Sequence, residues 1–123
     1  MKFKPTDSEL EILQILWENG ASSVRSVNDQ LNANREVGYT TTLKIMQIMA
    51  EKGLVTRNTD SRTHIYTAAV AEAEARQNLL EKFVDTTFRG SAMSLVMQAL
   101  GNHKASSEEL AEIKDLIRKM EEE

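Results

Sequence analysis

The most constraining feature of this sequence is a change in hydrophobic period close to residue 53. Before it, apolar residues recur every three or four positions, which is the spacing of amphipathic helices. After it come two short runs rich in β-branched and aromatic residues, Leu54–Arg57 and Thr63–Thr67. The segment between them, Asn58–Ser61, is polar and typical of a turn, so the two runs are predicted to form a β-hairpin.

Three helices are predicted before this hairpin. The first begins at Thr6, which has with Glu9 the S/T-x-x-E spacing of a capping box, and it ends at Asn19-Gly20. The second follows a serine cap at residue 22 or 23, and the third runs from about residue 38 to residue 53. Three short helices followed by a hairpin predict a winged helix-turn-helix fold, which is a DNA-binding architecture.

The predicted third helix has an apolar face and a polar face. Thr42 is expected on the buried face, and Trp17 of the first helix is likewise expected in the core. The polar face carries side chains that can hydrogen-bond base edges in the major groove, while arginines of the hairpin are expected to contact the DNA backbone. The residues predicted to contact DNA are Tyr39, Thr40, Thr41, Lys44, Gln47, Arg57, Arg62 and His64.

The net charge of −4 argues at first against a nucleic-acid partner. The distribution of charge removes this objection. Residues 1–70 carry eight basic and eight acidic side chains, whereas residues 71–123 carry seven basic and eleven acidic ones. Because the acidity belongs to the second half, a locally basic face in the first half is compatible with DNA binding.

The second half is predicted to be all-helical. Breaks at residues 89–91 and at Gly101-Asn102 divide it into three helices, the last capped by Ser106 or Ser107. Such a short segment cannot bury all its apolar side chains against itself, so a two-fold-related copy is expected to cover them, although packing onto the chain's own winged helix is an alternative. Residues 1–70 are therefore predicted to be a winged-helix DNA-binding domain and residues 71–123 a helical dimerisation domain. The residues predicted at the dimer contact are Leu79, Leu80, Phe83, Val84, Phe88, Leu95, Val96, Leu110, Ile113 and Ile117.

Several classes of protein are excluded by what the sequence lacks. It has no cysteine, and His64 and His103 have no neighbouring ligands, so neither a metal nor another cofactor is expected. It contains no nucleophile–base pairing and no glycine-rich phosphate loop, so an enzyme is not expected. No apolar run is long enough for a membrane span and no signal peptide is evident, which predicts a cytoplasmic protein without membrane insertion.

An ordered set of short motifs resembles the BlaI/MecI family of penicillinase repressors. The set comprises Thr6-x-x-Glu9, Ile12-Leu13-x-Ile15-Leu16-Trp17, Tyr39-Thr40-Thr41, Lys52-Gly53-Leu54-Val55 and Arg62-x-x-x-Tyr66. The resemblance implies a homodimeric repressor that binds a palindromic DNA operator through its third helix and is held together by its C-terminal helices. It also implies a membrane-bound sensor metallopeptidase as a partner, which induces transcription by cleaving the repressor in its fifth helix.

Two departures from the family pattern affect regulation. Gln98-Ala99 stands where the family has its cleaved Asn-Phe bond, so induction by the usual sensor is put in doubt. Copper-responsive relatives carry a cysteine motif near the C-terminus, and the absence of cysteine excludes that chemistry here.

Two other functions are compatible with a winged helix. Ile48 on the presumed DNA-facing side favours a module that binds a protein instead of DNA. A ligand-gated repressor is the other alternative, and it would need a pocket near Tyr66 and Phe83, where the sequence offers no ligand-specific polar group.

Overall fold

The computed structural model describes residues 4–102 and 105–123 and divides into two compact units, one ending at Leu80 and one spanning Glu81–Glu123. His103, for which no metal was expected, lies outside the described residues. The division falls after the predicted domain boundary at residue 70 because the helix α4 (Glu72–Thr87) begins within the first unit, where its Ala75 is buried in the core.

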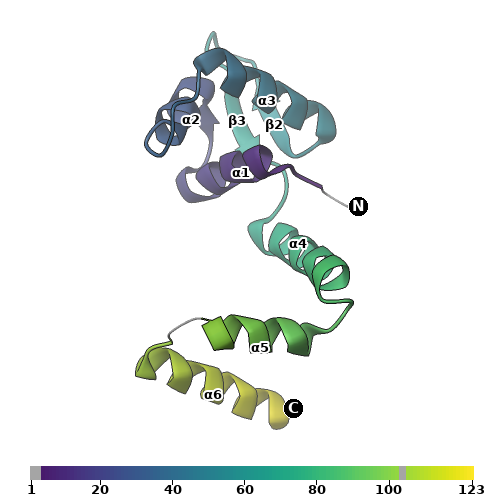
Figure 1. The fold of residues 1–123 in the computed structure, drawn as a ribbon. Helices are drawn as coiled ribbons and strands as arrows, with labels where there is room; N and C mark the ends of the chain where they lie inside the picture. Colours follow the sequence, from purple (N-terminus) through teal and green to yellow (C-terminus); the bar gives the residue numbers. More distant parts are fainter. Residues whose placement is uncertain (1–3, 103–104) are drawn as a thin grey trace. The chain divides into compact units, whose positions relative to one another are not determined.

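The first unit has the predicted order of three helices followed by a hairpin (Figure 1). The mainly helical, winged-helix fold class is thereby confirmed. Both hairpin strands lie one or two residues later than predicted. The elements are α1 (Asp7–Asn19), β1 (Ser22–Ser23), α2 (Val24–Leu31), α3 (Tyr39–Lys52), β2 (Val55–Asn58) and β3 (Ile65–Ala68).

A third strand, β1, was not predicted from the sequence. It pairs antiparallel with β3, with Ser22 opposite Tyr66, so the sheet order is β1-β3-β2. Two serines carry no strand signal of their own. The strand forms because Ser23 also caps α2, its hydroxyl accepting a hydrogen bond from the Ser26 amide, which leaves the backbone before the helix extended beside β3.

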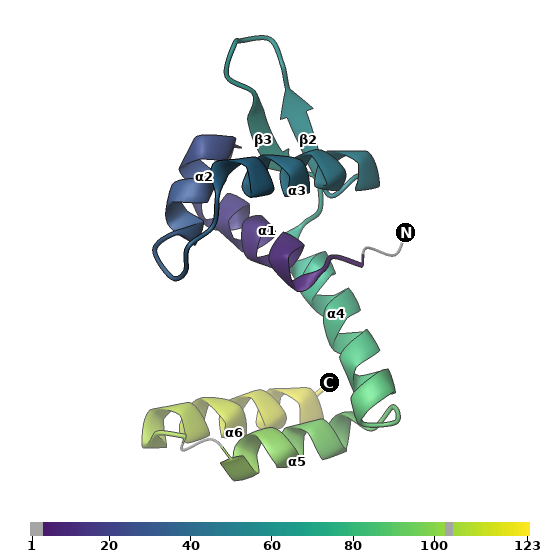
Figure 2. The ribbon, with the colours of Figure 1, turned by 45° about the horizontal axis from the view of Figure 1, so that its top comes forward.

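The core of the first unit is built from apolar side chains of α1, α2, α3, the hairpin and the start of α4. Figure 2 shows how the three helices and the hairpin lie together. Thr42 is fully buried, and Trp17 packs against the core while its indole N–H donates to the Val70 carbonyl at 3.0 Å. Both residues are therefore core residues, as predicted. The buried apolar side chains are Ile12, Leu13, Leu16, Val24, Val27, Leu31, Met46, Met49, Leu54, Val55, Tyr66, Val70 and Ala75.

The predicted capping box at the start of α1 is present and has a second function. Thr6 and Glu9 exchange side-chain and backbone hydrogen bonds, and the Glu9 carboxylate, only 4% exposed, also accepts from Lys52 Nζ at 2.7 Å. Lys52 is the last residue of α3, so this ion pair ties the start of α1 to the end of α3. Burial raises the pKa of Glu9, but the hydrogen bonds from Lys52 and Thr6 together hold it below the ordinary value.

Acid is expected to destabilise the first unit through Glu9. Because its pKa is lowered on folding, the ionised Glu9 contributes stability above the unfolded-state pKa, and that contribution is lost as the pH falls through the folded-state value. Glu9→Gln keeps a side chain that can complete the capping box but removes its charge. We expect this change to lower the free energy of unfolding by about 1 kcal/mol near pH 7 and by progressively less below about pH 4.5. Urea unfolding followed by the fluorescence of Trp17, the single tryptophan, measures this.

The matched control is Glu11→Gln, which removes the carboxylate of the solvent-exposed pair with Arg35. Exposed pairs contribute little, so this variant should follow the wild-type pH profile. A Glu9→Gln penalty that stays constant from pH 7 to pH 3 would contradict the assignment of this stability to the Glu9 charge.

The second unit contains the remainder of α4, together with α5 (Ala92–Asn102) and α6 (Ser107–Glu121), which lie next to each other in Figures 1 and 2. The predicted break at Arg89-Gly90 is present, with both residues at positive φ. Gly101 and Asn102, which were predicted to break the helix, are instead the last two residues of α5, so this helix ends two residues later than predicted.

None of the described side chains of α5 or α6 is buried. No helix in the described ranges is both long and apolar enough to cross a membrane. The second unit therefore presents apolar helix faces that its own side chains leave uncovered.

Candidate nucleic-acid interface

The outer face of α3 is polar and exposed, as predicted. Tyr39, Thr40, Thr41, Lys44 and Gln47 all lie on this exposed surface. The opposite face supplies buried core residues, among them the fully buried Thr42. Because the inner face is fixed in the core, the outer side chains extend from a rigid helix, which is what base recognition in a major groove requires.

A network of amide hydrogen bonds, buried at Asn28 and exposed at Asn32, holds the turn that precedes α3. Asn28 Nδ2 donates to the Val37 carbonyl at 3.0 Å and to Thr42 Oγ1 at 2.8 Å. Asn32 Nδ2 donates to the same carbonyl and its Oδ1 accepts from the Val37 amide. Asn28 was not singled out from the sequence, since a polar residue within a short helix is usually solvated, and Asn32 was predicted only to end the second helix.

The hairpin lies beside α3 and brings its cations to two places along that helix, one near its first turn and one near its C-terminal half. Arg57 on β2 shares a shallow hollow with Gln47 and Glu51 of α3. Arg62 and His64, in the segment before β3, line a larger groove. All three predicted hairpin residues are exposed, and the structure brings them to the neighbourhood of α3.

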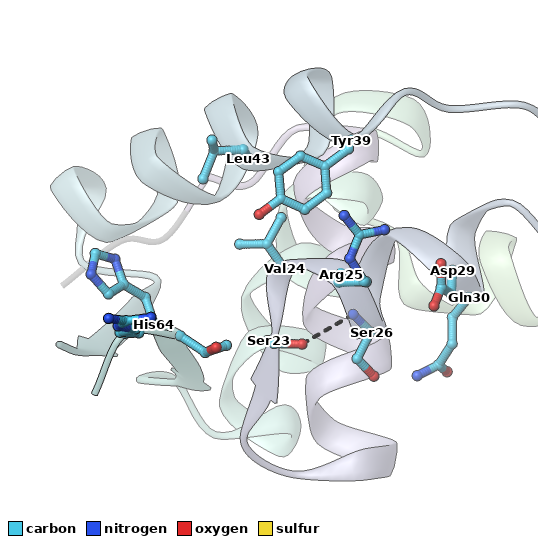
Figure 3. A pocket seen from close by; sticks show the side chains of 11 residues that line it. Ser23, Val24, Arg25, Ser26, Asp29, Gln30, Tyr39, Leu43 and His64 are labelled. Carbon is cyan, nitrogen blue, oxygen red and sulfur yellow. Dashed lines mark hydrogen bonds between the residues drawn. The ribbon is translucent and has the colours of Figure 1, made fainter. Parts of the chain in front are cut away.

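This larger groove, of about 690 Å³, lies between the first turn of α2, the first turn of α3 and the hairpin. Figure 3 shows the Arg25 guanidinium against the ring of Tyr39, with His64 across the groove. The guanidinium carbon lies 4.9 Å from the ring centroid, which is cation–π geometry. Sequence reasoning missed Arg25. A signal was available, because a cation in the first turn of a helix opposes the helix dipole and calls for an explanation.

Ion pairing separates the basic residues of the first unit into two groups. Arg35, Lys52 and Arg76 are bound to glutamates. In contrast, the four cations around α3 and the groove are exposed and form no ion pair with any residue in 4–102 or 105–123. These unpaired cations are Arg25, Lys44, Arg57 and Arg62. Their positive charge is therefore free to interact with an anionic partner.

The side chains predicted at a dimer contact are either exposed or half-buried in the single chain. Phe83 and Phe88 pack edge to face, with ring centroids 5.7 Å apart, so each ring partly covers the other. Several exposed apolar residues of the second unit were not among the predicted contacts. These residues are Met93, Met97, Leu100, Leu116 and Met120. The exposed apolar faces of α5 and α6 are therefore broader than the spacing of apolar residues in the sequence predicted.

Two further predictions concern chemistry in the described chain. No group of three or more His, Cys, Asp or Glu side chains that could hold a metal ion occurs in residues 4–102 and 105–123. Gln98-Ala99, which was expected to stand at the position of a cleaved bond, lies on the exposed surface of α5.

Comparison with known proteins points to one family. The profile described as penicillinase repressor matches residues 5–119. The methicillin resistance regulatory protein MecI of Mammaliicoccus sciuri is 20% identical over 95% of each chain. The transcriptional regulator BlaI of Mycobacterium tuberculosis is 29% identical over 82% of this chain and 77% of its own. The solution structure of the DNA-binding domain of the repressor BlaI superimposes with a TM-score of 0.52, at 22% identity over 60% of this chain and 93% of that domain.

Proposed function

The chain belongs to the penicillinase repressor family, whose members are transcriptional repressors and not enzymes, and we propose that it represses as a homodimer bound to a palindromic DNA operator. The observation that carries this proposal is the combination of a rigid polar face on α3 with exposed cations on and beside it that form no ion pair among the described residues. A surface of this kind is complementary to a DNA major groove and its bordering phosphates.

Within this proposal the predicted residues have two different tasks. Thr40, Lys44 and Gln47, with their neighbours Tyr39 and Thr41, face the bases or the edge of the groove from α3. Arg57, Arg62 and His64 contact the backbone from the hairpin and thus fix the orientation of α3 without reading sequence.

The dimer part of the proposal assigns residues 71–123 to self-association and residues 1–70 to DNA. It is supported by the exposed apolar faces of α5 and α6, which a two-fold-related copy would cover. A two-fold dimer would present two copies of α3 to half-sites about 34 Å apart, one turn of DNA.

Substitutions on α3 test whether it reads bases. Lys44→Ala and Gln47→Ala are each expected to weaken operator binding by about 1–3 kcal/mol, that is roughly 5- to 150-fold, while binding to random DNA falls much less. The operator is first obtained by selecting bound sequences from random DNA, and affinities are then measured at one fixed salt concentration. The control Arg76→Ala removes an exposed arginine paired with Glu72 on α4 and should bind as wild type. Equal losses on operator and random DNA would remove the base-reading role.

The proposal extends to location and induction. A repressor must reach the chromosome, so we propose that it acts in the cytoplasm. We also propose that, if a membrane-bound sensor metallopeptidase releases it from DNA by cleaving α5, that peptidase accepts Gln98-Ala99 in place of an Asn-Phe bond.

The alternative of a protein-binding module rests on one side chain. Ile48 is 39% exposed, and Tyr39 is the other exposed large apolar residue in the described part of the winged helix, residues 4–70. Single exposed apolar residues are ordinary, whereas protein interfaces present contiguous patches. The alternative of a ligand site near Tyr66 is also weakened, because that side chain is fully buried in the core.

A further inference from the structure

We propose that Arg25 binds a phosphodiester of the DNA backbone and that Tyr39 is the positioning residue that holds its guanidinium ready. This inference rests on the proposed function and adds a contact from α2 to those of α3 and the hairpin. It assigns to Tyr39 a task different from base reading.

The fold itself gives no reason for an arginine at this position. Arg25 is the second residue of α2, where the positive end of the helix dipole disfavours a cation. Asp29, one helical turn later, is the acidic residue that lines the groove, yet Arg25 forms no ion pair with it or with any other described residue. The contact that the structure gives to the guanidinium is the Tyr39 ring, 4.9 Å away.

This contact holds the guanidinium without an ion pair, so its N–H groups remain available to hydrogen-bond an anion. A phosphate accepts a planar pair of such donors in bidentate fashion. Holding a long side chain in place before binding also reduces the entropy lost when the contact forms.

The surroundings of Arg25 favour an anion from DNA. Arg62 and His64 line the same groove from the hairpin, so its lining contains two arginines and one aspartate. Tyr39 is the first residue of α3, so the groove opens directly beside the end of the helix assigned to the bases (Figure 3). The groove is therefore placed to receive the backbone that borders the recognised major groove.

Salt dependence tests the proposal, because one phosphate contact contributes about 0.9 to the slope of log K against log salt. Arg25→Ala is expected to weaken operator and random DNA by a similar factor, roughly 5- to 10-fold, and to reduce the slope by about one. Arg35→Ala is the matched control, since Arg35 is an exposed arginine of the same unit already paired with Glu11, and it should leave the slope unchanged. An unchanged slope for Arg25→Ala would overturn the phosphate contact.

The role of Tyr39 is tested by a conservative pair of variants. Tyr39→Phe keeps the ring and should bind DNA more tightly than Tyr39→Leu, which should lose affinity. The Arg25→Ala/Tyr39→Leu double variant should be no weaker than Arg25→Ala alone. If Phe and Leu are equally weak, the hydroxyl and not the ring is responsible, and the positioning role is wrong. Full additivity of the two losses would also overturn it.

The source of the anion is tested with operators that carry a neutral methylphosphonate at single positions. One linkage should weaken wild-type binding and leave Arg25→Ala unaffected. If no linkage behaves in this way, and inorganic phosphate at constant ionic strength instead competes with DNA through Arg25, the groove binds free phosphate and the backbone assignment is wrong. A wild-type protein that binds no DNA would overturn the proposed function together with this contact. If the wild type binds DNA and Arg25→Ala binds it with the same affinity and salt slope, only this contact is overturned.

Discussion

Replacing Ile117 by glutamate is expected to make the protein monomeric and to lower its affinity for a palindromic operator by about 10²- to 10⁴-fold. Ile117 is 52% exposed on α6, on the same stripe as Leu110 and Met120, and lies at the proposed dimer contact. In a two-fold dimer the substitution places two carboxylates in the interface, and burying an unpaired charge costs several kcal/mol. Each monomer would then bind one half-site, without the increase in affinity that comes from linking two DNA-binding domains.

The fold of the single chain should not change, because Ile117 is exposed in it and glutamate favours helix. Ala111→Glu adds the same charge to another side of α6, so it is the matched control and should remain dimeric. The measurements are the solution mass by light scattering, the helical content by circular dichroism and the affinity for one-site and two-site DNA. A wild type that is itself monomeric at micromolar concentration, or an Ile117→Glu variant that stays dimeric, would contradict the proposed interface.

The elements of this chain that were predictable are those specified by local chemistry. Thr6 and Glu9 identify the start of α1 because both partners of the capping box lie within one turn. Gly53 ends α3 because its φ of +83° is open to glycine at no steric cost. In contrast, β1 forms by pairing with β3, which is distant in the sequence, so the residues of β1 do not by themselves predict the strand.

The same distinction applies to the candidate site. The exposed face of α3 follows from helical period alone, and Thr40, Lys44 and Gln47 lie on it as predicted. Arg25 meets Tyr39 only because the turn between α2 and α3 folds back, and no spacing rule connects residues so placed. Groups that position a site are therefore harder to find than those that face the ligand, since their partners are distant in sequence.

Asn28 is such a positioning group, and Asn28→Ala is expected to destabilise the first unit by about 2–3 kcal/mol, a fall in melting temperature of roughly 10–20 °C. The amide bridges α2 to Thr42 of α3 and to the Val37 carbonyl in the turn between them. Removing it leaves the fully buried Thr42 hydroxyl without its donor, which costs more than a solvated hydrogen bond contributes. The start of α3 should also loosen, so operator affinity should fall more than affinity for random DNA.

A double variant separates this network from a general loss of packing. Replacing both hydrogen-bonding partners removes the unsatisfied group, so Asn28→Ala with Thr42→Val should cost less than the sum of the two single changes, by about 1 kcal/mol. Asn34→Ala is the matched control, because Asn34 is exposed in the same turn and its side chain forms no hydrogen bond with the described residues. Unfolding in urea followed by Trp17 fluorescence reports on this unit, since the indole N–H is hydrogen-bonded to the Val70 carbonyl at the edge of the same core. If the two losses of unfolding free energy are strictly additive, Asn28 acts through packing alone. The turn before α3 is then held by the hydrogen bonds of Asn32 and not by those of Asn28.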